Sequence, residues 1–71
     1  MLRLRLWRLA EGLTQTEAAR RLGMSHLTLG YLETGRLAPS DRDRDRLRQV
    51  FGDDADRMFE VVGHDLEGAA R

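Results

Sequence analysis

Residues 14–35 contain two short helical segments separated by a glycine, and this pattern constrains the fold more than any other feature. Thr14 and Glu17 have the three-residue spacing of a capping box, which marks a helix start. Gly23 can adopt the left-handed conformation that ends a helix, and Ser25 is a favourable N-cap for the next one. The segment therefore predicts two helices joined by a short turn.

Capping residues and apolar spacing elsewhere in the chain predict an all-α domain of five helices. We expect these helices at about residues 2–11, 14–22, 25–33, 40–51 and 53–62. Ser40 and Asp43 mark the start of the fourth. Apolar residues of the fifth recur at the spacing of an amphipathic helix, at Ala55, Met58, Phe59 and Val62.

The two ends of the chain need separate interpretation. Residues 2–6 alternate leucine with arginine, which is a strand pattern, but no hairpin partner follows, so a helix is favoured. Residues 64–71 are small and polar, and we expect a flexible tail after a domain of residues 1–63.

Composition excludes several classes of protein. The 71 residues make one domain, and the absence of cysteine excludes disulfides and thiolate metal sites. No apolar run approaches the roughly 20 residues of a membrane span. Arginines interrupt the first leucines, unlike a secretory signal, so we expect a soluble cytoplasmic protein.

The formal net charge is zero, but the charges are unevenly distributed. Residues 1–36 hold six arginines and three glutamates, whereas residues 37–71 hold six arginines and nine acidic residues. A basic half can face phosphate groups while an acidic half faces away. Chance and the requirement of solubility for mixed charge are the alternative explanation.

The expected second and third helices have a small and apolar contact surface, supplied by Ala19, Leu22, Met24, Leu29 and Leu32. At 100° per residue, the opposite side of the third helix carries Leu27, Gly30, Tyr31 and Thr34, with His26 at its edge. This outward side has no place in a monomer core and is available for a groove.

These positions belong to a longer pattern, which comprises Leu4, Trp7, Arg8, Leu13-Thr14-Gln15, Glu17, Ala19, Leu22-Gly23-Met24-Ser25, Leu29, Leu32-Glu33, Gly35 and Pro39-Ser40. The pattern resembles the XRE family of helix-turn-helix domains, which includes the phage Cro and repressor domains. The resemblance extends over about residues 3–62. It implies a compact lambda-repressor-like domain whose helix-turn-helix is formed by the second and third helices.

Three positions depart from the family pattern. Ala18 stands where leucine is usual, and Asp43 and Arg44 stand where the fourth helix usually has an apolar residue. We therefore expect a thin core and a loosely packed fourth helix, held by Leu47, Val50 and Phe51.

The resemblance implies that the third helix, at about residues 25–33, enters the DNA major groove. The residues that match base-contacting positions are His26, Leu27, Thr28 and Tyr31. A histidine can donate to guanine, and a leucine can contact a thymine methyl group. Because this side has no Gln, Asn or Arg, we expect modest specificity that depends partly on DNA shape. A solvated surface histidine is the alternative for His26.

Phosphate contacts are implied at two places. Thr14 and Gln15 match positions at the start of the second helix, where backbone N–H groups also favour an anion. Thr34, Gly35 and Arg36 match a second phosphate-contacting loop. A simple polar helix start and a solvated arginine are the alternatives.

Two sets of charges are expected to have structural roles. Arg8 and Glu33 match a family pair that ties the first helix to the end of the third. Residues 41–46 alternate aspartate with arginine, which favours Asp-to-Arg pairs three residues apart on a solvated helix face. A charged surface for a partner is the alternative interpretation.

The first helix has apolar residues on two sides. Leu4 and Trp7 face the domain, whereas Leu2, Leu6 and Leu9 lie on the opposite side. We predict that these three leucines form a homodimer interface or bind another protein. The alternatives are that the tail with Leu66 covers them, or that they are scattered surface leucines.

These features together predict sequence-specific binding of double-stranded DNA by a transcriptional regulator, specifically a repressor. The alternative is a protein-interaction module on the same fold, such as an antitoxin-like or adaptor protein. His26 and His64 are too isolated to form a metal site, and no nucleophile–base pair or glycine-rich phosphate loop is present. We therefore expect neither an enzyme nor a cofactor, and no small-molecule ligand.

Overall fold

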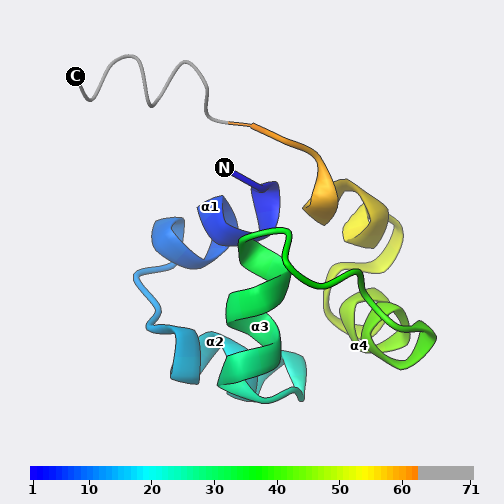
Figure 1. Cartoon of the computed structure of the whole chain (residues 1–71), viewed down its shortest axis with the longest axis horizontal. Helices are drawn as coiled ribbons and strands as arrows, with labels where there is room; N and C mark the ends of the chain where they lie inside the picture. Colours follow the sequence, from blue (N-terminus) through cyan, green and yellow to red (C-terminus); the bar gives the residue numbers. More distant parts are fainter. Residues whose placement is uncertain (63–71) are drawn as a thin grey trace.

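The computed structural model describes residues 1–62, which form four α-helices and one 3-10 helix. They are α1 (Arg3–Ala10), α2 (Gln15–Leu22), α3 (His26–Glu33), α4 (Asp41–Phe51) and η1 (Gly52–Phe59). Figure 1 shows α3 at the centre of the view, with α1 above it and α4 and η1 to its right. The expected boundary at Gly63 and the tail 64–71 lie outside the described residues.

Side-chain caps begin three of the helices, as the sequence predicts. The Thr14, Ser25 and Ser40 hydroxyls each accept a hydrogen bond at 3.1 Å from the backbone N–H three residues later. Thr14 and Ser40 complete capping boxes with Glu17 and Asp43. The first helix is also α-helical as predicted, so the strand alternative for residues 2–6 is wrong.

The prediction of a fifth α-helix is wrong. Residues 52–59 form a 3-10 helix instead, and Glu60 leaves it with an extended backbone. The next residues lie beside the N-terminus, where Leu2 and Val61 form an isolated antiparallel bridge. Arg3 N donates to the Glu60 carbonyl at 2.9 Å, which requires the chain to leave the helix before Val62.

The core is small and is made mostly of leucine and alanine. Its buried hydrophobic residues are Leu4, Ala18, Ala19, Leu22, Leu29, Leu32, Leu47, Ala55 and Met58. The helix α4 is held by Leu47 and by Phe51, whose ring meets Trp7 edge to face at a centroid distance of 5.0 Å. Val50 was expected to help but is exposed.

The charged run 41–46 pairs differently from the prediction. Arg44 reaches Asp56 of η1 at 3.9 Å, and Arg46 donates to the Gly23 carbonyl. Among the described residues, the pair of the predicted three-residue spacing in α4 is Asp45–Arg48, at 3.5 Å. Two arginines of the run therefore connect α4 to other elements instead of to its own aspartates.

No helix within residues 1–62 combines the length and the apolar character needed to cross a membrane.

Candidate nucleic-acid interface

Helices α2 and α3 pack against each other through their buried faces, across a turn at Gly23. Ala19 and Leu22 of α2 and Leu29 and Leu32 of α3 belong to one core cluster. Gly23 ends α2 with φ of 70°, a conformation that glycine adopts without strain. The predicted contact surface between the two helices is thus present, with Met24 partly buried against it.

A buried ion pair fixes the C-terminal end of α3 to α1. Arg8 donates to both carboxylate oxygens of Glu33, at 2.7 Å from Nε and 3.0 Å from Nη2. The two side chains are only 11% and 1% exposed, so little water competes for this bidentate pair. Arg8 also donates to the Leu13 carbonyl at 3.0 Å, which ties in the turn between α1 and α2. The pair joins the residues that the sequence predicted.

Gln15 also belongs to this network, which the sequence interpretation missed. Its side-chain nitrogen donates to Glu33 Oε1 at 3.3 Å and lies above Gly30. A Cβ at Gly30 would meet that nitrogen at 3.5 Å, an ordinary van der Waals contact, so the amide lies directly over this part of α3. The same side chain keeps a second N–H, which remains able to donate to a phosphate.

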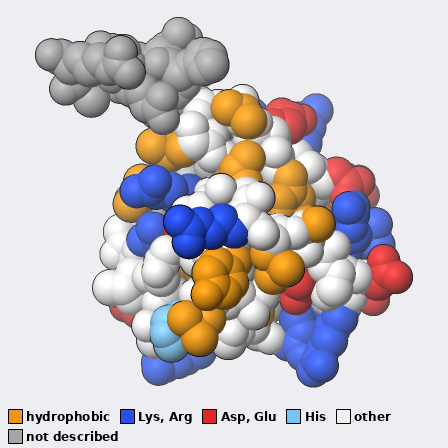
Figure 2. All heavy atoms as spheres, in the orientation of Figure 1, with side chains coloured by type: hydrophobic (Ala, Val, Ile, Leu, Met, Phe, Trp, Pro, Cys, Tyr) orange, Lys and Arg blue, Asp and Glu red, His pale blue; other side chains and the backbone are white. Residues whose placement is uncertain are grey.

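The side of α3 that faces away from the core is apolar and accessible. Leu27 is 61% exposed and Tyr31 is 47% exposed, although both are large hydrophobic side chains. His26 is also exposed, at the first residue of the helix. Figure 2 shows hydrophobic side chains on this face of the molecule, next to a histidine. Three of the four predicted base-contacting residues therefore reach the surface together.

Thr28 differs from the other three. It is half-buried, and its hydroxyl accepts a hydrogen bond at 2.9 Å from Ser25, the N-cap of the same helix. It lines a cleft beside Arg42 and Arg46 of α4. The structure therefore places Thr28 toward α4 and separates it from the side that carries Leu27 and Tyr31.

The loop after α3 presents the second set of predicted phosphate contacts. The Thr34 hydroxyl donates to the Gly30 carbonyl at 3.0 Å, so it closes the end of its own helix. Gly35 has φ of 73° with open space around it. Arg36 is exposed, and no ion pair involves it within residues 1–62. Its guanidinium group is accordingly available to a ligand.

The Thr14 capping box lies at the start of α2 and shifts one ionisation. Thr14 N donates to Glu17 Oε1 at 3.0 Å. Hydrogen bonds from the backbone and hydroxyl of Thr14 hold the pKa of Glu17 below its usual value. Thr14 is exposed, so its structural role leaves the helix start accessible.

The three leucines predicted to form an interface are not equally accessible. Leu9 is 47% exposed, whereas Leu2 and Leu6 are half-buried. Residues 60–62 lie beside Leu2, so part of this side is covered by the chain after η1. Leu66, which the sequence suggested as a cover, lies outside the described residues.

Comparison with protein families gives a match that covers most of the chain. The helix-turn-helix domain family matches residues 2–59. The chain belongs to this family. No curated protein and no solved structure matched in the corresponding searches.

Membership in the helix-turn-helix domain family indicates DNA binding and a role in transcription regulation, and such domains are typically not enzymes. The match includes α1 through η1, so the Arg8–Glu33 pair and the outward side of α3 belong to the domain itself. Within residues 1–62, no group of three or more His, Cys, Asp or Glu side chains is arranged to hold a metal ion.

Proposed function

We propose that this helix-turn-helix domain is a sequence-specific, XRE-type transcriptional repressor that inserts α3 into the DNA major groove. One observation carries the proposal: α3 is tied to α1 and α2 by hydrogen bonds, and its outer side is nevertheless exposed. Arg8, Glu33 and Gln15 fix α3, while Leu27 and Tyr31 remain exposed beside it.

In this proposal the base contacts come from His26, Leu27 and Tyr31, and Thr28 is a lesser contributor. Leu27 offers apolar surface to a thymine methyl group, and His26 can donate to guanine. Gln15, Thr14 and Arg36 then contact phosphates on the two sides of the groove, with the Thr34–Gly35 backbone beside Arg36. The exposure of His26, Leu27, Tyr31, Gln15, Thr14 and Arg36 supports these roles, whereas Thr28 is half-buried.

The test combines a selection with a salt titration. Selection of bound duplexes from a random pool should yield a common sequence of a few base pairs. Binding should weaken steeply with salt, because phosphate contacts release counterions. The slope of log K against log salt is negative, and Arg36→Ala should make it less steep by about 0.9. Arg57→Ala is the matched control, since Arg57 is an exposed arginine of η1 and should leave the slope unchanged.

Binding of a polypeptide is the second candidate function, and the apolar outer side of α3 favours it. The outer side of α3 offers two large hydrophobic residues and no Arg, Asn or Gln. Exposed apolar patches of this kind often mark protein-interaction sites. A polypeptide-binding module would show almost no affinity for random duplex DNA at either low or high salt, which separates the two functions.

We also propose that two copies, or this chain and a partner protein, associate through the outer side of α1. Leu9 is its most exposed leucine, with Leu6 half-buried nearby and Leu2 at the margin. Helix-turn-helix proteins commonly read two half-sites about one DNA turn apart, which requires two domains.

A further inference from the structure

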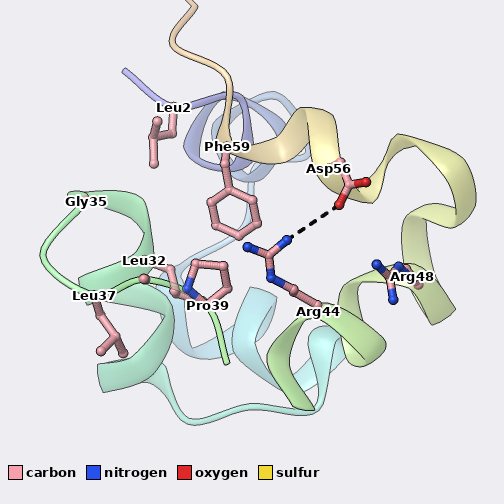
Figure 3. A pocket seen from close by; sticks show the side chains of 10 residues that line it. Leu2, Leu32, Gly35, Leu37, Pro39, Arg44, Arg48, Asp56 and Phe59 are labelled. Atoms are coloured by element: carbon pink, nitrogen blue, oxygen red, sulfur yellow. Dashed lines mark ion pairs between the residues drawn. The ribbon is translucent and has the colours of Figure 1, made fainter. Parts of the chain in front are cut away.

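A groove with a volume of about 520 Å³ lies on the domain, beside the loop that follows α3. The loop residues Leu37 and Pro39 form one wall, and Arg44 of α4 and Phe59 of η1 form the other. Figure 3 shows the ring of Phe59, the ring of Pro39 and the guanidinium group of Arg44 directed toward the same space. The volume falls within the roughly 300–1,000 Å³ of small-molecule sites.

The loop residues after α3 and the ring of Phe59 supply the apolar part of the groove lining. Leu32 at its base is fully buried, while Phe59 and Pro39 are half-buried and keep a free surface toward the groove. Leu37 at the rim is 45% exposed. A flat apolar group placed here would cover the ring of Phe59 on the side that the small core leaves open.

One wall of the groove carries two arginines and the carboxylate of Asp56. Arg44 and Arg48 both line it, four residues apart on α4, so their side chains emerge from the same helix face. Their aspartate partners hold them weakly. Arg44 lies 3.9 Å from Asp56 and Arg48 lies 3.5 Å from Asp45, and all four side chains are about half exposed or more. Surface pairs of this kind contribute little, so a ligand carboxylate can replace Asp56 on Arg44.

We propose that this groove binds a small organic carboxylate with a flat apolar body. The apolar body lies against Phe59, Pro39 and Leu37, and the carboxylate accepts hydrogen bonds from the guanidinium group of Arg44. A carboxylate on a guanidinium fork can be bound bidentately, which distinguishes an acid from a neutral molecule of the same shape.

Such a ligand would also act on DNA binding, and this consequence rests on the function proposed above. The loop that forms one wall begins at Gly35 and includes Arg36, which is the proposed phosphate contact. Binding in the groove would hold this loop in one conformation and thereby change the affinity for DNA.

The experiment uses the full chain without DNA, so that it is independent of the proposed function. Naphthaleneacetate is titrated into the protein, and binding is followed through the backbone amide NMR signals of the protein. Naphthaleneacetamide serves as the neutral probe, and acetate serves as the probe that lacks the aromatic ring. We expect naphthaleneacetate to shift the signals of residues 35–39 and 56–59 at millimolar concentration. The amide should bind about tenfold more weakly, and acetate should not bind.

Two variants then test the role of Arg44. Arg44→Gln should remove the preference for the acid over the amide, while Arg42→Gln, an exposed arginine of α4 that does not line this groove, should preserve it. Shifts in other regions, equal binding of acid and amide, or an equal effect of both variants would overturn the proposal. Absence of any shift would also overturn it.

A separate titration with duplex DNA tests the regulatory consequence. If naphthaleneacetate binds the groove but leaves DNA affinity unchanged, the ligand site stands and the coupling is wrong. If the chain binds no DNA at all, the proposed function fails while the NMR result for the groove is unaffected.

Discussion

Glu33 is the residue on which the orientation of α3 most depends. Its carboxylate is almost fully buried and receives hydrogen bonds from Arg8 and from Gln15. These donors come from α1 and α2, so one side chain fixes α3 relative to both preceding helices. A buried carboxylate is costly unless it is paired, and the arrangement therefore penalises any shift of α3 that breaks the pair.

Removing only the cation of this pair should destabilise the domain strongly. Arg8→Met leaves the Glu33 carboxylate buried with Gln15 as its remaining side-chain partner, and the free energy of unfolding should fall by about 3–5 kcal/mol. The double variant Arg8→Met, Glu33→Leu removes both charges and should recover much of this loss. Urea unfolding of the wild type, of Arg8→Met, of Glu33→Leu and of the double variant measures the coupling. If the double variant is as unstable as the sum of the single variants, the two residues are not coupled.

Glu17 should make stability depend on pH in the acidic range. Its pKa is lowered in the folded state by hydrogen bonds from Thr14, so the folded state favours the ionised carboxylate. The contribution is present above the unfolded-state pKa and is lost as the pH falls through the folded-state pKa. The stability difference between the wild type and Glu17→Gln should therefore be constant near neutral pH and shrink on acidification below the ordinary value of 4.5. A difference that grows on acidification would contradict this assignment.

At the scale of the elements, local signals predicted most of the fold. Thr14, Ser25 and Ser40 set three helix starts because each cap depends on residues only three positions away. The end of the domain could not be predicted in this way. The spacing of Ala55 and Met58 suits a 3-10 helix as well as an α-helix, and the departure at Glu60 depends on pairing with residues at the N-terminus.

The candidate site was predictable to a similar degree. Helical geometry alone places Leu27 and Tyr31 opposite the core, and both are exposed. The placement of Thr28 toward α4 depends on where α4 packs, which no local pattern specifies. The Gln15–Glu33 contact likewise depends on the crossing of α2 over α3, which no local pattern specifies.

A side chain at Gly23, in the turn between α2 and α3, should cost more than backbone strain alone. A Cβ there would lie 2.6 Å from Nη1 of Arg46, so this flexible side chain would have to move and give up its hydrogen bond to the Gly23 carbonyl. Gly12 is the matched control, because its φ of 69° is nearly the same and its Cβ would meet nothing within 4 Å. Gly12→Ala should lower the free energy of unfolding by about 1–2 kcal/mol from strain alone, and Gly23→Ala should lower it further.

Removing the Arg46 side chain separates the two effects at Gly23. In an Arg46→Ala background the glycine variants should have similar costs, because only the backbone strain then remains. Urea unfolding of six proteins provides the comparison, namely each parent and its two glycine variants. Equal costs for Gly12→Ala and Gly23→Ala in the wild-type background would show that Arg46 does not restrict the turn.

At the scale of the whole molecule, the charge distribution accompanies the arrangement of the helices. Helices α1 and α2 carry five arginines and one glutamate, and α4 carries four arginines and three aspartates, so the acidic excess among residues 37–62 lies in η1 and at Glu60. Thr14, Gln15 and Arg36 all belong to the basic half. The segregation thus agrees with the proposed DNA-facing surface, although the net charge of zero makes long-range attraction to DNA weak.

Two half-sites on DNA require two copies of the domain, and we propose that these copies associate through α1. Leu9 and its half-buried neighbour Leu6 offer a small apolar surface, so the dimer of the free protein should be weak and should strengthen on DNA with two half-sites. Leu9→Glu places a charge in this contact and should shift the protein toward monomer in sedimentation experiments. Its affinity for a single half-site should remain unchanged.

Val50→Glu is the matched control for this prediction. Val50 is 45% exposed, nearly the same as the 47% of Leu9, but it lies on α4 and not on α1. A general effect of added charge would reduce association in both variants, whereas an α1 interface predicts loss only in Leu9→Glu. A wild type that remains monomeric at high micromolar concentration, both free and on DNA with two half-sites, would exclude association through α1 and leave each domain to bind its half-site independently.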